Sequence, residues 1–515
     1  MKKATIAATI ISLLLFQSCY KDLSTEASLE IPEISIEGID NSLTIAFGQT
    51  ISFTPTVTQE GRTEDDFEYL WEMDITPQAM SGRMELSTEK DLEMRISNTP
   101  SDKPYTISFK ATDKITGLSK TVGCRLYVGS SLGEGLLVAH TRDNGATSEF
   151  DLVANEFLTW GYTGKVRYTR NLWSLTNEGT FEGNVNDMIE ICDTDGGVFN
   201  ENKILVGTDE HIIAIDPLTF KVKYMDGANF NNTSESSFRT TLFGHVGGYS
   251  SYAVVNGKLF GIICHIDNKF SAVAFSKEKK DVFGPHNIGN AMLDQGNLMA
   301  FNEEDGLFYN LAGWQIMNGA LSEITSNFGF DTNGAKSIAG GGTKGNRPAL
   351  LVHSADGKYH ICIASFETVI PEVTHYQVSD GDLDNMVAAA FCDNADLMYY
   401  TNGKEIYAVL MSGGKATTKK LSWKPASEDE TVTDIFQYRQ AWMGTHQYYL
   451  SEYEFPLATN RLQMVIVTYN EKTGEGKFYL RPYNVSTGLF TYKDNGSYGG
   501  FGKISSIAPL FSPYV

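Results

Sequence analysis

Carboxylates at alternate positions form the densest group of chemically competent side chains in this sequence. The run Ser379–Asn385 reads SDGDLDN and places three aspartates two residues apart. Calcium prefers several such oxygen ligands, and an EF-hand loop opens with the same spacing. The glutamate that an EF-hand needs at its twelfth position is replaced by Phe391. The run is therefore interpreted as a solvated loop, and no metal site is predicted.

Motifs for nucleophilic or metal-assisted catalysis are absent or isolated. The sequence contains neither H-E-x-x-H nor G-x-S-x-G, and its two S-x-x-K matches, at Ser87 and Ser276, lie in charged stretches without partner motifs. His353 and His360 flank one predicted hairpin and are expected to face each other as a structural pair. No enzymatic activity and no cofactor are expected.

Aromatic side chains close to turns are the remaining candidates for ligand binding. Carbohydrate rings stack on such side chains, and peptides use them as anchors. These weak candidates are Trp160, Tyr162, Trp173, Trp314 and Trp442. The alternative is that they pack between neighbouring sheets, because such packing also consumes many aromatic residues.

The N-terminal residues predict an export signal. Lys2 and Lys3 precede the apolar stretch Ala4–Phe16, whose 13 residues are too few for a helix to cross a hydrocarbon core of about 30 Å. This pattern is typical of a signal peptide, which is predicted over residues 1–18. Cys19 follows a small residue at its end, and this arrangement resembles a bacterial lipobox. The resemblance implies acylation of Cys19 and stable anchoring in a lipid bilayer by several acyl chains.

Ordinary secretion is the alternative to this lipid anchor. Residues 19–30 are polar and are predicted to form a tether. The other cysteines are odd in number and lack a C-x-x-C motif, so they are predicted to be small buried hydrophobic residues. They are Cys124, Cys192, Cys264, Cys362 and Cys392.

The composition favours a large all-β protein. Of the 515 residues, 42% are hydrophobic, which is too many for a disordered chain, and 12% are aromatic. The 48 glycines against 14 prolines favour strands joined by tight turns. A net charge of -22 repels phosphate backbones, so no nucleic-acid partner is expected.

Residues 31–129 are predicted to form one β-sandwich. Apolar and polar residues alternate in short stretches, which is typical of strands with one buried face. The stretches are Ser42–Phe47, Ile51–Val57, Phe67–Asp74, Tyr105–Asp113 and Val122–Val128. About seven short strands in about 100 residues indicate an immunoglobulin-like fold.

Two of these strands carry a more specific pattern. Tyr69, Trp71 and Asp74 lie on the first, and Tyr105, Ala111, Asp113 and Gly117 lie on the second and its turn. The pattern resembles the polycystic kidney disease (PKD) domain family, although Lys103-Pro104 stands where that family usually has a glycine. The resemblance implies a PKD-like sandwich, and Trp71 is expected in its core.

Residues 132–515 show a different, repeating organisation. Seven times an apolar stretch is followed by a turn, often Asn-Gly or Asp-Gly, which supply the positive φ angles of two-residue hairpins. The turns lie near residues 144, 209, 256, 305, 356, 402 and 473, a mean spacing of about 55 residues. Such repeats predict a β-propeller of about seven blades. Further β-sandwich domains are the alternative.

One repeat can be followed strand by strand. Met386–Phe391 is rich in small residues, which suits a crowded central channel. Leu397–Thr401, Glu405–Leu410 and Thr418–Trp423 complete a four-stranded meander. The two longest gaps between turns leave room for another unit, so six to eight blades are allowed.

The combination of Cys19, a PKD-like module and a propeller-like remainder resembles the PKD-like family lipoproteins of Bacteroidetes. This resemblance implies a surface-exposed protein, lipid-anchored in the outer membrane, that acts as a non-catalytic binding or accessory protein of a TonB-dependent uptake system for glycans or peptides. The transporter and its lid lipoprotein would be its partners. A propeller-fold glycan lyase or hydrolase is an alternative that needs convergent carboxylates. A surface adhesin or structural subunit is the other.

Overall fold

The computed structural model describes residues 32–47, 49–77, 82–98, 103–129, 134–159, 162, 164–191, 202–245, 250–263, 269–271, 283–290, 297–312, 321–368, 370–440 and 457–510. Strands dominate these ranges and the helices are short turns, so the all-β prediction is confirmed. None of the helices in these ranges is long and apolar enough to span a membrane.

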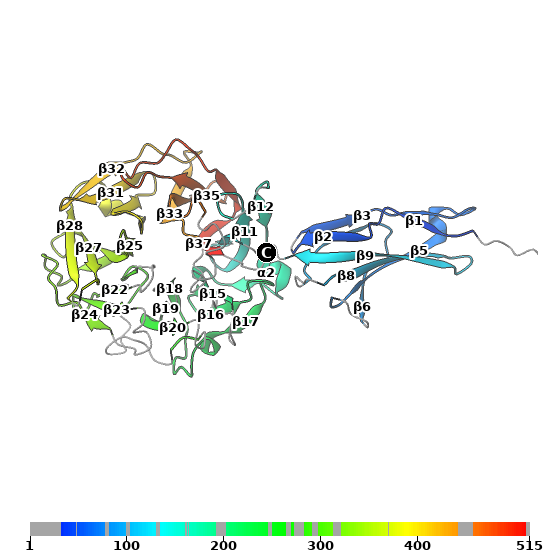
Figure 1. Ribbon diagram of the computed structural model, residues 1–515, viewed down its shortest axis with the longest axis horizontal. Coiled ribbons are helices and arrows are strands. Elements are labelled where there is room, and N and C mark those ends of the chain that lie inside the picture. Colours follow the sequence, from blue (N-terminus) through cyan, green and yellow to red (C-terminus); the bar gives the residue numbers. More distant parts are fainter. Residues whose placement is uncertain are drawn as a thin grey trace, which may run out of the picture. The chain divides into compact units, whose positions relative to one another are not determined.

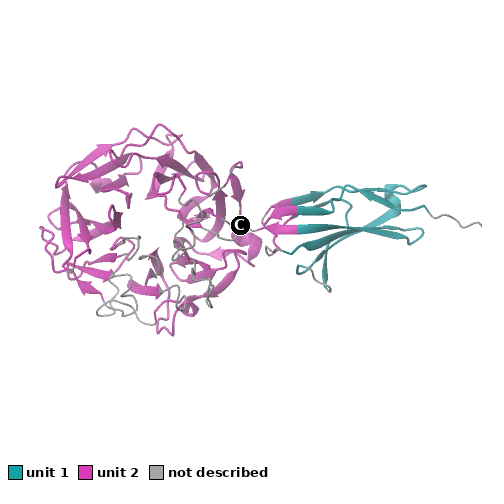
Figure 2. Ribbon diagram, in the orientation of Figure 1, with its two compact units in different colours: residues 1–43, 51–94, 103–126 teal, residues 44–50, 95–102, 127–515 magenta. Residues whose placement is uncertain are grey.

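The chain divides into two compact units (Figure 2). The first contains residues 1–43, 51–94 and 103–126, and the second contains residues 44–50, 95–102 and 127–515. The boundary passes through single strands, and the domain limits at 129 and 132 stay predictions.

Nine strands lie within residues 32–129 in the described part of the chain. β1 (Ser35–Glu37) pairs with β4 (Thr56–Thr58), and β3 (Thr50–Phe53) pairs with β7 (Leu92–Arg95). The remaining sheet has the order β2 (Ser42–Ala46), β9 (Ser119–Gly129), β8 (Tyr105–Asp113), β5 (Phe67–Asp74) and β6 (Arg83–Ser87). Neighbouring strands in this sheet for which a register is given, such as β5 and β8, run antiparallel.

Trp71 on β5 lies in the core that these sheets enclose. Its side chain is fully buried, and its ring centroid lies 5.4 Å from that of Phe53 and 4.6 Å from that of Phe109. The indole Nε1 donates a hydrogen bond to the backbone oxygen of Lys90 at 3.1 Å. The polar atom of the indole is therefore satisfied, and the predicted core position of Trp71 is confirmed.

Asp113 at the end of β8 organises the turn that the PKD-like pattern predicts. Its carboxylate accepts hydrogen bonds from the Ile115 amide and the Thr116 hydroxyl, both at 2.8 Å, and pairs with Arg62 at 2.9 Å. Gly117 has a φ of +74°, a left-handed conformation that glycine adopts without strain. The pattern therefore identifies a side chain that holds a hairpin closed.

We expect Asp113→Asn to remove an acid-dependent part of the stability. Burial acts to raise the pKa of Asp113, but hydrogen bonds from Ile115, Thr116 and Arg62 lower it from 3.8 to about 2. A lowered pKa stabilises the folded state above about pH 4, and this contribution is lost as the pH falls toward about 2. Urea midpoints of wild type and variant should therefore differ at pH 7 and converge in acid. Asp65→Asn, at an exposed carboxylate, is the control, and an equal difference at all pH values would contradict the prediction.

Within the described residues, seven antiparallel sheets of the second unit are arranged in a ring (Figure 1). The first combines β10 (Gly135–Thr141), β11 (Thr147–Ala154), β12 (Arg167–Thr169), β13 (Phe181–Glu182) and β37 (Lys503–Leu510). The second contains β14 (Val185–Ile191), β15 (Lys203–Thr208), β16 (Ile212–Ile215) and β17 (Val222–Met225). The third contains β18 (Thr240–His245), β19 (Ser250–Val255) and β20 (Lys258–Ile263).

The other four sheets continue in chain order. The fourth contains β21 (Ile288–Asn290), β22 (Asn297–Asn302), β23 (Leu307–Ala312) and β24 (Ser322–Glu323). The fifth contains β25 (Lys336–Thr343), β26 (Arg347–His353), β27 (Tyr359–Ser365) and β28 (Glu372–Val378). The sixth contains β29 (Ala388–Phe391), β30 (Leu397–Thr401), β31 (Ile406–Ser412) and β32 (Lys415–Lys420). The seventh contains β33 (Glu430–Gln437), β34 (Gln463–Asn470), β35 (Glu475–Pro482) and β36 (Ser497–Phe501).

The first sheet is built from both ends of the ring segment. β37 pairs with β10 from Gly135 opposite Leu510 to Thr141 opposite Lys503, and β10 pairs with β11 on its other edge. Every residue of β10 is buried. Residues that are far apart in the sequence therefore close the ring.

The hydrophobic core of the ring lies between neighbouring sheets. One cluster joins Tyr399 and Ala408 of the sixth sheet to Ile466 and Tyr479 of the seventh. Another joins Phe301 of the fourth sheet to residues of the fifth. Each sheet thus buries both faces against its neighbours, which explains the continuous apolar runs in the sequence.

The cysteines within the described residues are buried. Cys124, Cys362 and Cys392 are buried free thiols, as predicted, and Cys192 and Cys264 lie outside the described residues.

The expected pairing of His353 with His360 is wrong. The register places His353 opposite Tyr359 and His360 opposite Val352. His360 instead meets His375 on β28, with 2.7 Å between Nδ1 and Nε2. The turn between β26 and β27 sets this register, and a shift by one residue moves a side chain to the other face of the sheet.

Candidate functional site

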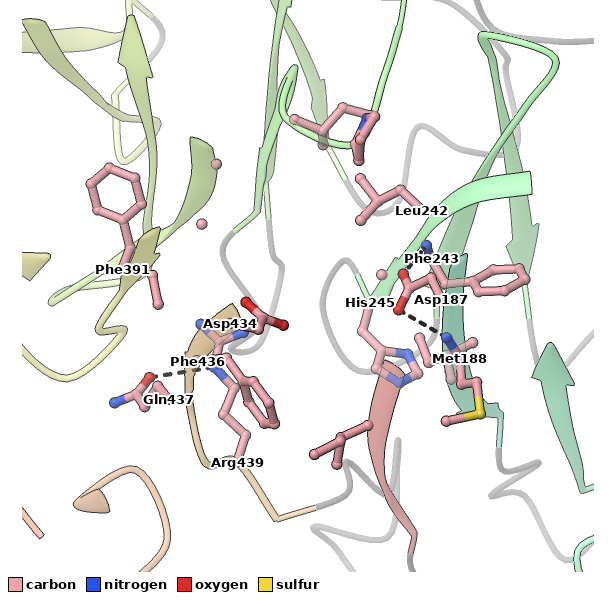
Figure 3. Close-up of a pocket in the computed structure, with 18 of the residues that line it drawn as sticks. Asp187, Met188, Leu242, Phe243, His245, Phe391, Asp434, Phe436, Gln437 and Arg439 are labelled. Atoms are coloured by element: carbon pink, nitrogen blue, oxygen red, sulfur yellow. Dashed lines mark hydrogen bonds between the residues drawn. The ribbon is translucent and has the colours of Figure 1, made fainter. Parts of the chain in front are cut away.

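A cavity of about 460 Å³ lies inside the ring (Figure 3). Each of the seven sheets contributes to its lining, through β14, β18, β21, β25, β29, β33 and β37. Except for β37, these are the first strands of their sheets in the chain. The prediction that Met386–Phe391 lines a central channel is confirmed, because Ala389, Ala390 and Phe391 face this cavity.

Asp187 and Asp434 each follow a β-bulge in a strand that lines the cavity. The pairing of β14 with β15 shifts register between Val185 and Asp187, and the pairing of β33 with β34 shifts between Val432 and Asp434. Such β-bulges re-aim the side chains that follow them and are common beside functional sites. The carboxylates of Asp187 and Asp434 therefore point into one cavity from two sheets (Figure 3).

The two carboxylates differ in their hydrogen bonds. Asp187 accepts the Met188 amide at 2.8 Å on Oδ1 and the Phe243 amide at 2.7 Å on Oδ2. Asp434 accepts only the Ile435 amide, at 2.8 Å on Oδ1, among the described residues. The Oδ2 atom of Asp434 is thus the carboxylate oxygen that the protein leaves available.

Enclosure within the ring raises the pKa of both groups. Burial raises the pKa of Asp187 to about 7, and the negative charge of Asp434 adds to the shift. Burial raises the pKa of Asp434 to about 6, although its side chain is exposed to the cavity itself. Both groups therefore exchange protons near neutral pH, where an ordinary aspartate stays ionised.

Arg439 and two histidines also line the cavity. The Nε atom of Arg439 lies 3.1 Å from Asp393, a carboxylate outside the pair that Arg439 shares with Arg461. Burial lowers the pKa of His245 to about 4, and burial also lowers the pKa of His286. Both imidazoles are neutral at pH 7.

The wall formed by β25 and β29 is made of small residues. Gly340, Gly341 and Ala339 lie on β25, and Ala389 lies on β29. A Cβ atom on Gly340 would lie 1.9 Å from the backbone oxygen of Ile288, so only glycine allows the neighbouring inner strands to approach this closely. The small side chains leave room for a ligand in the cavity.

The site does not fit a metal cofactor. No group of three histidine, cysteine, aspartate or glutamate side chains in the described ranges could hold a metal ion.

In the acidic run Ser379–Asn385, the carboxylate of Asp382 accepts hydrogen bonds from Asn385 and Asn402, both at 2.7 Å. The Asp382 carboxylate therefore stabilises the loop that contains it.

The predicted aromatic candidates lie away from the cavity or outside the described residues. Trp173 is buried and packs edge-on against Phe181, with ring centroids 4.8 Å apart. Tyr162 is half-buried, and its hydroxyl donates a hydrogen bond to the backbone oxygen of Lys165 at 2.5 Å. Neither residue lines the cavity. Cys19, Trp160, Trp314 and Trp442 lie outside the described residues.

The sequence interpretation missed Asp187, Asp434 and Arg439. A signal for the two aspartates exists, because Val-x-Asp followed by two apolar residues occurs at Val185 and again at Val432. Arg439 carries no comparable signal.

A second hollow, of about 730 Å³, lies among turns of the first two sheets. Its polar groups are engaged with each other or with neighbours. Asp209 lies 3.3 Å from Arg239, and the Nδ1 atom of His211 lies 3.0 Å from Asp226. These contacts make it a weaker candidate than the cavity inside the ring.

Residues 19–184 match the model of a family described as the PKD-like family. The match begins at Cys19 and ends one residue before β14. The resemblance that Tyr69, Trp71 and Asp113 indicate is thus confirmed over this span. No curated protein matches the chain.

Several solved structures resemble the chain at low identity. A quinonprotein alcohol dehydrogenase-like protein from Bacteroides thetaiotaomicron VPI-5482 is 13% identical, covers 94% of this chain and 99% of its own, and has a TM-score of 0.47. Apo AztD from Citrobacter koseri is 10% identical, with coverages of 86% and 98% and a TM-score of 0.36. PorZ, a surface component of the type-IX secretion system of Porphyromonas gingivalis, is 8% identical, with coverages of 77% and 51% and a TM-score of 0.33.

Proposed function

We propose that this chain is a lipid-anchored binding protein of the outer membrane that captures a small polar ligand inside its ring. It would serve as an accessory protein of a TonB-dependent uptake system for glycans or peptides. The cavity lined by all seven sheets is the observation that carries the capture role. Its volume of about 460 Å³ falls in the range of small-molecule sites.

We also propose a fold for the ring and a fold for residues 31–129. The ring would be a seven-bladed β-propeller, because small antiparallel sheets follow one another around an axis and β37 closes the first of them. Residues 31–129 would be an immunoglobulin-like sandwich that acts as a spacer from the membrane. The tether at residues 19–30 and the acylated Cys19 would supply the attachment.

A glycan hydrolase or lyase is the second candidate. The convergence of Asp187 and Asp434, with pKa values of about 7 and about 6, favours it because a general acid must hold its proton near neutral pH. This activity predicts that the purified protein releases new reducing ends from a polysaccharide. The capture role predicts that a bound ligand is recovered intact.

We expect Ala389→Trp to block capture without unfolding the ring. Ala389 lines the cavity on the small-residue wall, so an indole there would fill ligand space. Purified wild type and variant are loaded with a defined mixture of oligosaccharides and short peptides, washed, and analysed by mass spectrometry of the eluate. The expected result is a loss of at least tenfold in bound ligand with a thermal transition that stays cooperative, although its midpoint falls because Ala389 also packs against the core between the fifth and sixth sheets.

Thr417→Trp is the matched control for this experiment, because Thr417 is exposed on the outer strand β32. This variant should retain the ligand at the wild-type level. Equal retention by Ala389→Trp would place binding outside the cavity and would overturn the capture proposal.

Association with a transporter is tested separately. Tagged protein is purified from detergent-solubilised outer membranes, with Cys19→Ala as the control for anchoring. The accessory role predicts that a TonB-dependent transporter and its lid lipoprotein copurify with the wild type. Recovery of the protein alone would contradict stable docking and would favour the enzyme or adhesin hypotheses.

A further inference from the structure

The charge inside the cavity is unbalanced. Asp187 and Asp434 form no ion pair among the described residues, and their only hydrogen-bond donors are backbone amides. Arg439 is the one permanent cation among the described lining residues, and it shares Asp393 with Arg461. Two carboxylates therefore face one enclosed space, and neither is ion-paired among the described residues.

The other titratable groups around the cavity do not supply the missing charge. His245 on β18 and His286 before β21 are neutral at pH 7, because burial lowers their pKa values. Burial raises the pKa of Tyr252 on β19, so its hydroxyl stays protonated. Glu190 on β14 is buried and adds no positive charge.

A second polar group in the lining also lacks a protein partner. Thr241 lies at the bulge of β18, between Thr240 and Leu242, and its hydroxyl oxygen is buried without a hydrogen-bond partner among the described residues. The residue itself is half-buried, so a rotation about its χ1 angle would turn this hydroxyl toward a ligand and satisfy it. It belongs to the same lining as the two carboxylates.

The wall formed by β25 and β29 restricts the shape of the occupant. Gly340, Gly341 and Ala389 present small surfaces, and Phe391 presents an aromatic ring. A ligand that reaches the carboxylates therefore has a compact, partly apolar body behind its charged group. A metal ion does not meet this description, and the described lining lacks the ligands that one needs.

We propose that the cavity recognises a protonated primary amine, held between Asp187 and Asp434 with the body of the ligand against the β25–β29 wall. The inference rests on the proposed capture role and names the chemical class of the captured ligand. An amino sugar and the free amino terminus of a short peptide share this chemistry.

Binding of the amine should release protons and should strengthen as the pH rises from about 5 to about 7. In the free protein the pKa values of about 7 and about 6 keep the carboxylates partly protonated at these pH values. A cation between them favours their ionised forms and therefore displaces those protons. His245 does not reverse this trend, because its lowered pKa of about 4 leaves it neutral over this range, and burial also lowers the pKa of His286.

The test is isothermal titration calorimetry on the full chain. Glucosamine and triglycine amide are the amine probes, and their N-acetylated forms are the neutral counterparts. Each titration is repeated in buffers of different ionisation enthalpy, which measures proton release. The expected result is at least tenfold tighter binding of an amine than of its acetylated form, with protons released, and the stronger probe identifies the source of the amine.

Asp434→Asn is the informative variant, because Asn retains the oxygen that accepts the Ile435 amide and removes only the charge. It should weaken amine binding at least tenfold and lower the proton release to the share that Asp187, with its higher pKa, contributes. Asp187→Asn is less informative, since its amide nitrogen would face one of two backbone amides. Glu428→Gln, at an exposed carboxylate, is the matched control and should bind like the wild type.

The outcomes separate this inference from the capture role. Equal affinity for acetylated and free amines, or wild-type affinity in Asp434→Asn, would overturn the amine class while capture stands. Binding of calcium or magnesium in place of the amines would also overturn it. Failure of every probe, together with equal ligand retention by Ala389→Trp, would overturn both proposals.

Discussion

Removal of residues 503–515 should prevent the ring from closing and abolish its cooperative unfolding transition. The deletion removes β37, which pairs with β10 over seven residue positions from Gly135 to Thr141. It also removes Ala508 and Leu510, which are almost completely buried. Lost backbone hydrogen bonds at about 1 kcal/mol each and lost apolar burial together amount to roughly 10 kcal/mol. That loss is comparable with the whole stability of a typical domain, about 5–15 kcal/mol.

Differential scanning calorimetry of the full and shortened chains measures this effect. A deletion of residues 511–515 alone is the control, because it leaves β37 in place and should preserve the ring transition. In limited proteolysis, the chain that lacks residues 503–515 should be cleaved within the ring segment. A ring transition that survives the longer deletion would show that β37 is not needed for closure.

Trp71→Ala should have the second-largest effect and should act on the first compact unit. The indole is fully buried between Phe53 and Phe109 and has its hydrogen bond to Lys90 satisfied. Truncation of a buried tryptophan to alanine costs about 3–5 kcal/mol. For a unit of about 100 residues this corresponds to a fall of about 15 °C or more in the midpoint of its thermal transition.

The measurement is again calorimetry of the full chain, with the ring transition as the internal reference. Ile115→Ala, at a side chain that is 68% exposed, is the control and should leave both transitions unchanged. Trp71→Phe should lie between the wild type and Trp71→Ala, since it retains an aromatic ring in the core. A wild-type midpoint in Trp71→Ala would contradict the assignment of Trp71 to the centre of this core.

The strands were predictable from the sequence where turns are marked by glycine. The stretch Leu397–Thr401 is β30 without a change of bounds, and Gly403 has the positive φ that its turn requires. The end of the same unit was less predictable. β32 begins at Lys415, three residues before the predicted strand, because the exposed residues of an outer strand carry little hydrophobic signal.

The cavity could not be predicted because it depends on pairings across the whole ring. Asp187 and Asp434 lie in different sheets, and their approach follows from the closure of β37 on β10. β10 reads only as an apolar stretch and β37 as a mixed one, so nothing local specifies that they meet. The raised pKa values are a further consequence of this enclosure, which no spacing in the sequence expresses.

The first sheet contains strands from both ends of the ring segment, and this arrangement allows the number of sheets in the ring to change in evolution. β10 to β13 and β37 form that sheet, and the family match ends at residue 184, one residue before the sheets that follow. Each later sheet is continuous in the sequence. Duplication or loss of one such unit would leave the closing pair intact and would change the diameter of the ring. A ring of this design can therefore change the size of its central cavity without altering the way in which it is closed.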